Sequence, residues 1–94
     1  MPKIYIAGPM TELKNLNKEA FDDYGQHLTG QGHAVMNPAS LPQGFSQAEY
    51  MDICLAMLRA CDEIHLLPGW KASPGACAEY AMATKLGMVA VFLT

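Results

Sequence analysis

The sequence predicts a small doubly wound α/β domain, a three-layer αβα sandwich of the Rossmann or flavodoxin-like type on a four-stranded parallel sheet. β-rich segments alternate with segments of helical periodicity along the chain. Glycine, proline and asparagine stand at the boundaries between these segments. The chain has 94 residues, which is the size of one domain, so we expect a single domain over residues 1–94.

The first half of the chain predicts a strand, a helix and a second strand. Residues 3–7 are rich in β-forming side chains and stop at Gly8-Pro9. Residues 17–30 carry apolar side chains on one helical face, and Asn15 or Asn17 can cap the start of this helix. Residues 33–36 predict a short second strand.

The second half predicts two more helix–strand units. Ser46 and Glu49 form a capping box that starts a helix over residues 47–60. A third strand follows at 63–67. Ser73 and Pro74 suit the cap and first position of a helix that runs to residue 86. Residues 88–93 are almost continuously apolar, which predicts a buried fourth strand.

Right-handed crossovers favour the strand order 2-1-3-4. In such a sheet the order reverses between strands one and three, and ligands bind beyond the carboxyl ends of the strands at that point. The loops that we expect there are Gly8-Pro9-Met10 and residues 68–73, with Asn37-Pro38 beside them.

Composition excludes several classes of protein. The net charge is −3 and only 16% of residues are charged, so the protein does not have the strongly basic surface that binding of duplex nucleic acid requires. Three cysteines without a C-x-x-C pair indicate reduced thiols in a cytoplasmic protein rather than a disulfide framework or a zinc site. The apolar start of the chain, residues 4–7, is too short for a signal peptide or a membrane span. We expect no metal and no cofactor.

Glu79 departs from its surroundings. The other members of its helical stripe are apolar or small: Ala76, Met82, Ala83 and Leu86. A carboxylate on an inward face is costly unless it is paired or used. Either Glu79 stands at the margin of the stripe and reaches water, or it is a functional carboxylate that faces a pocket, with Gly75 leaving room before it.

Three other residues each have two interpretations. Ser73 is a helix cap, or its hydroxyl and the neighbouring amides bind a phosphate. Tyr5 packs in the sheet, or it reaches the pocket from the first strand. Trp70 stacks on a base, or it covers the core or a subunit contact.

Several motifs together resemble the nucleoside 2-deoxyribosyltransferase-like superfamily, and most closely its short, often phage- or prophage-borne branch, which is DUF4406-like. The resemblance covers nearly the whole chain. The motifs are K-I-Y-I-A-G-P-M at 3–10, C-D-E-I at 61–64, L-L-P-G-W at 66–70 and S-x-G-x-x-x-E-Y-A at 73–81.

The resemblance implies roles for individual residues. Glu79 matches the nucleophile of the superfamily, and Tyr5 matches the tyrosine that orients this carboxylate. Gly8 and Pro9 match the loop around the ligand. Ser73 matches the position that contacts a 5′-phosphate in the nucleotide hydrolases, which favours a phosphorylated ligand. The expected substrate-binding set is completed by residues at the same sheet edge: Met10, Asn37, Trp70 and Gly75.

The chain departs from the superfamily at one catalytic position. Eight residues before the aspartate that matches Asp62, the superfamily commonly has an aspartate that helps to protonate the leaving base; here that residue is Cys54. Asp52 is the nearby acid, and we name it as a candidate, although two residues along a helix point to nearly opposite faces.

The resemblance implies an enzyme that cleaves the N-glycosidic bond of 2′-deoxynucleosides or their 5′-monophosphates, as a hydrolase or a deoxyribosyltransferase. The alternative is a non-catalytic nucleotide-binding module, which Cys54 and the end of the sequence directly after the last strand favour. We expect a homodimer or higher homo-oligomer, because the last helix has few charged positions outside Glu79 and Lys85.

Overall fold

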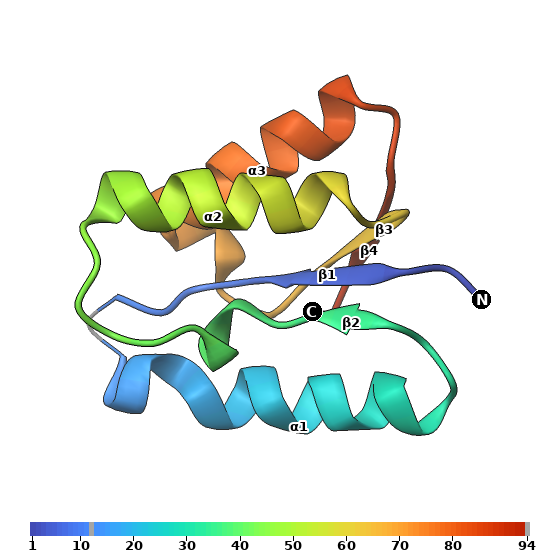
Figure 1. Ribbon diagram of the computed structural model, residues 1–94, viewed down its shortest axis with the longest axis horizontal. Helices are drawn as coiled ribbons and strands as arrows, with labels where there is room; N and C mark the ends of the chain where they lie inside the picture. Colours follow the sequence, from blue (N-terminus) through green and yellow to red (C-terminus); the bar gives the residue numbers. More distant parts are fainter. Residues whose placement is uncertain (12, 94) are drawn as a thin grey trace.

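The computed structural model describes residues 1–11 and 13–93, and it has the predicted architecture (Figure 1). Four parallel strands pair in the order β2-β1-β3-β4. Helix α1 covers one face of the sheet, and helices α2 and α3 cover the other. The strands and α-helices are β1 (Ile4–Ala7), α1 (Lys18–Gly30), β2 (Val35–Met36), α2 (Gln47–Arg59), β3 (Glu63–Leu66), α3 (Pro74–Lys85) and β4 (Val89–Phe92).

The central strand β1 determines which side chains meet on each face of the sheet. All four of its residues are buried, and successive side chains point to opposite faces. Ile4 and Ile6 pack in the cluster under α1, whereas Tyr5 and Ala7 belong to the cluster under α2 and α3. The alternation therefore places the Tyr5 hydroxyl on the same side of the sheet as α3.

Helices α2 and α3 begin as their cap sequences predict. The Ser46 hydroxyl accepts the Glu49 amide at 3.1 Å, and the Glu49 carboxylate accepts the Ser46 amide at 2.7 Å. The Ser73 hydroxyl oxygen accepts a hydrogen bond at 3.2 Å from the amide of Ala76, which is the third residue of α3. Both helices thus begin at defined residues on the edge of the sheet where the parallel strands end.

The start of α1 differs from the predicted cap. Asn17 is the N-cap residue, but it has left-handed backbone angles and its side chain makes no capping hydrogen bond. Its amide Nδ2 instead donates to the carbonyl of Pro9 at 3.0 Å. The side chain that was expected to start the helix therefore ties the loop after β1 to α1.

The prediction that the last strand is buried was wrong. β4 is an edge strand, and Val89 and Phe92 are 57% and 46% exposed. Val89 lies in register with Glu63 and Ile4, on the side of the sheet that α1 covers. In the described part of the chain α1 is the one α-helix on that face, and it packs over β1 and β2 rather than over β4. The apolar run at residues 88–93 therefore predicted a strand correctly, but it did not show whether helices cover both faces of that strand.

The second strand is also shorter than predicted, because only Val35–Met36 of residues 33–36 pair with β1. No helix in the described residues has the length and apolar character needed to cross a lipid bilayer.

Candidate functional site

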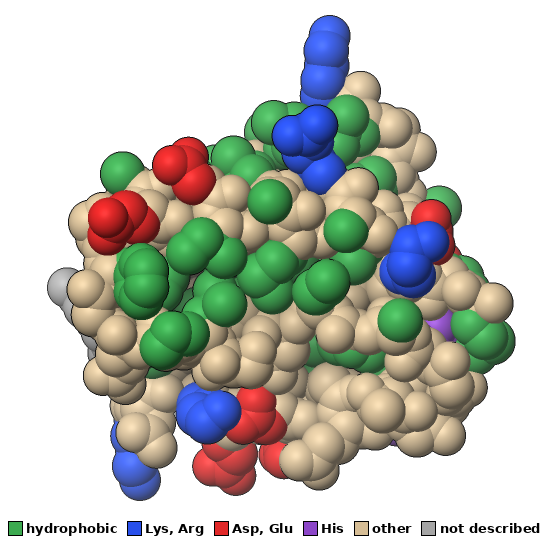
Figure 2. Space-filling model, viewed as in Figure 1, with side chains coloured by type: hydrophobic (Ala, Val, Ile, Leu, Met, Phe, Trp, Pro, Cys, Tyr) green, Lys and Arg blue, Asp and Glu red, His purple; other side chains and the backbone are tan. Residues whose placement is uncertain are grey.

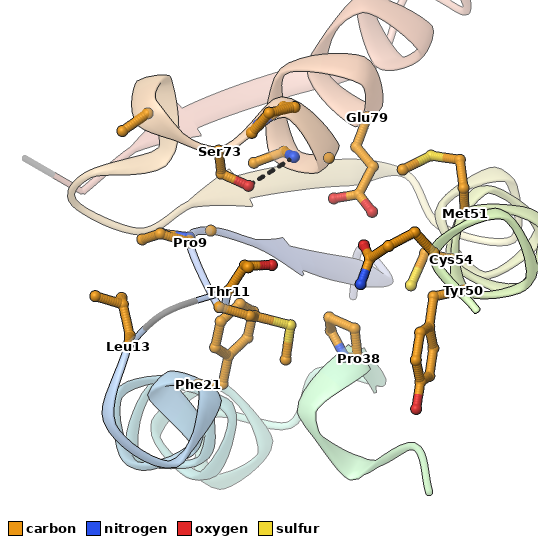
Figure 3. Close-up of a pocket in the computed structure, with 17 residues that line it drawn as sticks. Pro9, Thr11, Leu13, Phe21, Pro38, Tyr50, Met51, Cys54, Ser73 and Glu79 are labelled. Carbon is orange, nitrogen blue, oxygen red and sulfur yellow. Dashed lines mark hydrogen bonds between the residues drawn. The ribbon is translucent and has the colours of Figure 1, made fainter. Parts of the chain in front are cut away.

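A cleft of about 900 Å³ lies at the edge of the sheet where the loops after β1 and β3 leave it. Its walls come from both loops, from α2 and from the first turns of α3 (Figure 3). Figure 2 shows hydrophobic side chains gathered over the middle of this face of the molecule, between α2 and α1. The cleft lies at the predicted point, where the strand order reverses between β1 and β3.

Glu79 is the acidic side chain of this cleft. It lies in the second turn of α3 and is only 6% exposed, although its residue type is normally found at the surface. The Tyr5 hydroxyl donates a hydrogen bond to Glu79 Oε2 at 2.9 Å. Figure 3 shows the carboxylate pointing from α3 into the open space of the cleft. Glu79 therefore lies at the cleft and does not reach bulk water from the margin of its stripe, while its function stays a prediction.

Burial determines the protonation of this pair. Loss of water around Glu79 raises its pKa to about 7, and the hydrogen bond from Tyr5 acts in the opposite direction. Burial raises the pKa of the Tyr5 hydroxyl far above its ordinary value, and the nearby Glu79 adds to this. The Tyr5 hydroxyl therefore stays protonated and acts as the hydrogen-bond donor, while Glu79 changes between its neutral and ionised forms near neutral pH.

Cys54 lines the cleft from α2 and lies beside Tyr5 and Glu79. Burial raises the pKa of its thiol, the contact with Tyr5 acts in the opposite direction, and Glu79 adds to the rise, so the thiol keeps its proton at neutral pH. Asp52 does not join this group: it is exposed and does not line the cleft. A step of two residues along α2 turns a side chain by about 200°, so an inward Cys54 requires an outward Asp52.

The start of α3 borders the cleft with small residues. Ser73, Gly75 and Ala76 all line it, as do Gly8, Pro9 and Met10 from the loop after β1. A Cβ atom on Gly75 would lie 3.6 Å from the Met51 side chain, so the missing side chain leaves the cleft wider. A Cβ atom on Gly8 would lie 2.9 Å from Leu67 Cβ, and only glycine lets the loop pass so close to β3.

Two residues of the expected binding set lie outside the lining. Trp70 is 8% exposed and packs against Tyr80 and Phe92, with ring centroids 5.1 and 5.7 Å away. Asn37 accepts the Ala39 amide and donates to Asp22, both at 2.9 Å. Trp70 covers the core of the sheet, and Asn37 shapes the turn after β2.

Sequence reasoning missed the wall that α2 provides. Gln47, Tyr50 and Met51 line the cleft from the first turn of this helix. The Tyr50 hydroxyl donates to the Pro42 carbonyl at 2.6 Å, which fixes the ring at the cleft. An aromatic residue on a helix is usual in a core, and the one sequence signal for a site at Tyr50 is its position in the first turn, at the ligand-binding edge. The remaining lining residues are Thr11, Leu13, Phe21, Pro38, Ala72 and Pro74.

The model of a protein family described as "Domain of unknown function (DUF4406)" matches residues 2–92 of the chain. The chain belongs to the DUF4406 family. No curated protein matches the DUF4406 chain, and the family description itself assigns no activity. Within the described residues of this DUF4406 protein, no three His, Cys, Asp or Glu side chains come together as a metal site.

Proposed function

We propose that this protein cleaves the N-glycosidic bond of 2′-deoxynucleosides or their 5′-monophosphates, with Glu79 as the nucleophile. One observation carries the proposal: a buried carboxylate, oriented by a tyrosine hydroxyl at 2.9 Å, faces a cleft of about 900 Å³. Such a volume is within the range of small-ligand sites, which is about 300–1,000 Å³. The resemblance to the nucleoside 2-deoxyribosyltransferase-like superfamily supplies the reaction class.

In the proposed reaction, the Glu79 carboxylate is the nucleophile of the first step and the leaving group of the second. An oxygen of ionised Glu79 forms a bond to C1′ of the sugar while the bond from C1′ to the base nitrogen breaks, and the base keeps the electron pair. Water then attacks C1′ in a hydrolase, or the nitrogen of a second base attacks it in a transferase, and Glu79 leaves as the carboxylate. The attacking water or base gives up a proton to solvent, which balances the proton that the leaving base takes up. The Tyr5 hydrogen bond orients the carboxylate and helps to keep it ionised in a buried place.

The leaving base also needs a proton. Asp52 lies outside the cleft and Cys54 is a neutral thiol of raised pKa, so neither is assigned as the acid. Water that enters the cleft, or an acid from a second subunit, supplies the proton in this proposal. The same observation favours a second candidate function, a nucleotide-binding module without turnover, because no second carboxylate among the described residues lines the cleft.

We further propose that the protein is a homo-oligomer in the cytoplasm. Leu86 is 49% exposed, and Val89 and Phe92, on opposite faces of the edge strand β4, are 57% and 46% exposed, so a second copy docked along this edge would cover apolar surface. The three cysteines are free, as expected in a reducing compartment. Light scattering at micromolar concentration should give at least twice the mass of one chain, and a monomer would count against this.

The enzymatic proposal is tested by base release. Wild-type protein is incubated with the four common 2′-deoxynucleosides and their 5′-monophosphates, with and without an acceptor base, and the products are separated by chromatography. Replacement of Glu79 by Gln keeps the shape of the side chain but removes the nucleophile, so turnover should fall by about 10³-fold or more. Equal turnover in wild type and Glu79→Gln rejects the role of Glu79. Ligand binding without turnover in the wild type supports the binding module instead.

A further inference from the structure

The cleft has an unusual charge pattern for a nucleotide site. Among the 17 residues that line it, Glu79 is the one acidic side chain, and none is Lys, Arg or His. The two residues outside the described ranges, Glu12 and Thr94, are not basic either. A phosphate monoester carries a charge of about −1.5 to −2 at neutral pH, and in this cleft it would meet no cationic side chain.

The basic residues of the chain are all accounted for away from the cleft lining. Three of them have partners of their own: Lys3 lies 3.5 Å from Asp62, Lys18 lies 2.9 Å from Asp22, and Lys71 lies over the ring of Trp70. Two close the last turns of α2 and α3, and these turns lie at the sheet edge opposite the cleft. The last lines a second hollow, which shares Leu13 with the cleft but brings no basic residue into the cleft lining. These three are Arg59, Lys85 and Lys14.

The start of α3 does not replace the missing cations. Pro74 has no amide hydrogen, and the Ala76 amide already donates to the Ser73 hydroxyl oxygen. The Ser73 amide donates to the Trp70 carbonyl at 3.0 Å. The amide of Gly75 and the hydroxyl proton of Ser73 are what this end of the helix offers. One amide and one hydroxyl suit a sugar hydroxyl, whereas a phosphate presents three strongly accepting oxygens.

We infer that the substrate is an uncharged 2′-deoxynucleoside and that a 5′-monophosphate is discriminated against; this inference rests on the function proposed above. Ionised Glu79 repels a dianion held in the same cleft, and the described lining residues include no basic side chain to offset that repulsion. The inference runs against the expectation from Ser73 alone, because in this chain the Ser73 oxygen is engaged in capping α3.

The test compares each 2′-deoxynucleoside with its own 5′-monophosphate. In wild-type protein at pH 8, kcat/KM for base release should be about tenfold or more higher for the nucleoside, and calorimetry should rank binding in the same order. Equal or better turnover of the monophosphate overturns this inference and leaves the proposed function standing. Absence of both turnover and binding for every compound overturns the proposed function and this inference with it.

A charge added at the rim gives an independent measurement. Ala72 is exposed, lines the cleft and precedes Ser73, so Ala72→Lys places an ammonium group beside the start of α3. The ratio of monophosphate to nucleoside kcat/KM should rise about tenfold in Ala72→Lys and should stay near the wild-type ratio in the neutral variant Ala72→Gln. An unchanged ratio in Ala72→Lys means that charge does not control the choice of ligand, and it contradicts the inference.

Discussion

Each face of the sheet carries a tyrosine and a carboxylate that belong to one hydrogen-bonded group, and the two groups differ in how much of their hydrogen-bonding capacity is used. On the α2/α3 face, Tyr5 donates to Glu79 at 2.9 Å, and Glu79 opens on the cleft. On the α1 face, the hydroxyl of Tyr24 lies 2.5 Å from His65 Nδ1, and His65 Nε2 lies 2.8 Å from the Glu63 carboxylate. In the neutral ring, Tyr24 donates to Nδ1 and Nε2 donates to Glu63.

In the group of Tyr24, His65 and Glu63, the central histidine has no free hydrogen-bonding position. Both ring nitrogens of His65 have partners, its side chain is buried, and neither it nor Tyr24 nor Glu63 lines the cleft. Glu79 has one hydroxyl partner and open space before its carboxylate. A carboxylate whose hydrogen-bonding capacity is incomplete and which faces a cavity is a candidate for chemistry, whereas a group that its neighbours complete is expected to be structural.

The largest expected difference between the two groups is in stability against pH. The folded-state pKa of Glu79, about 7, is above its unfolded value, so the stability that its neutral form contributes is present below about pH 4.3 and is lost as pH rises through 7. Between pH 5 and pH 8 this lowers the free energy of unfolding by about 2–3 kcal/mol. Glu79→Gln removes that loss and should be more stable than wild type at pH 8.

Denaturant unfolding at both pH values measures this, with Glu63→Gln as the matched change on the other face. Glu63→Gln retains Glu79 and should keep the wild-type fall in stability. If Glu79→Gln instead unfolds more easily than wild type at pH 8, its carboxylate is a structural partner like Glu63, and the contrast between the two faces disappears.

The two tyrosines should separate next in activity. Removing the Tyr5 hydroxyl takes away a hydrogen bond that lowers the pKa of Glu79, so Tyr5→Phe should move the alkaline rise of kcat/KM above pH 7. Loss of orientation adds to this, and we expect about tenfold lower kcat/KM at pH 7. In Tyr24→Phe the pH profile should keep its wild-type midpoint.

A pH–rate profile of base release from pH 5 to 9 makes the comparison. The shift of midpoint is the decisive readout, because a merely destabilised protein loses activity without moving it. A Tyr5→Phe midpoint equal to that of wild type would show that the hydroxyl does not act on Glu79 during turnover.

The sequence predicts the fold and one half of the site for identifiable reasons. Periodicity and turn residues are local signals, and they gave the element order and the strand order that the structure has. Glu79 was found because a carboxylate among small and apolar residues is a local anomaly. Tyr50 and Met51 carry no such anomaly, so their part of the α2 wall is visible only in the tertiary structure, and Cys54 was singled out only through the resemblance.

Side-chain direction in the loops was the least predictable part, although the loop residues Gly8, Pro9, Met10 and Ser73 line the cleft as predicted. Trp70 follows β3 at the edge where the cleft lies, but its ring turns to Tyr80 and Phe92 because β4 leaves that part of the core to be covered. The direction of a loop side chain depends on which neighbouring surface is uncovered, and sequence spacing does not contain that information.

The smallest expected effect concerns the space in front of Glu79. Gly75→Ala adds one methyl group 3.6 Å from Met51, an ordinary contact, so α3 should form and gain up to about 1 kcal/mol of stability. The same methyl group narrows the cleft, so KM should rise a few-fold with little change in kcat. Gly30→Ala is the matched control, because nothing lies within 4 Å of the added atom at the end of α1. Steady-state kinetics that show equal KM in both variants would mean that the ligand does not extend over the start of α3. The ligand would then approach the Glu79 carboxylate from another side of the cleft.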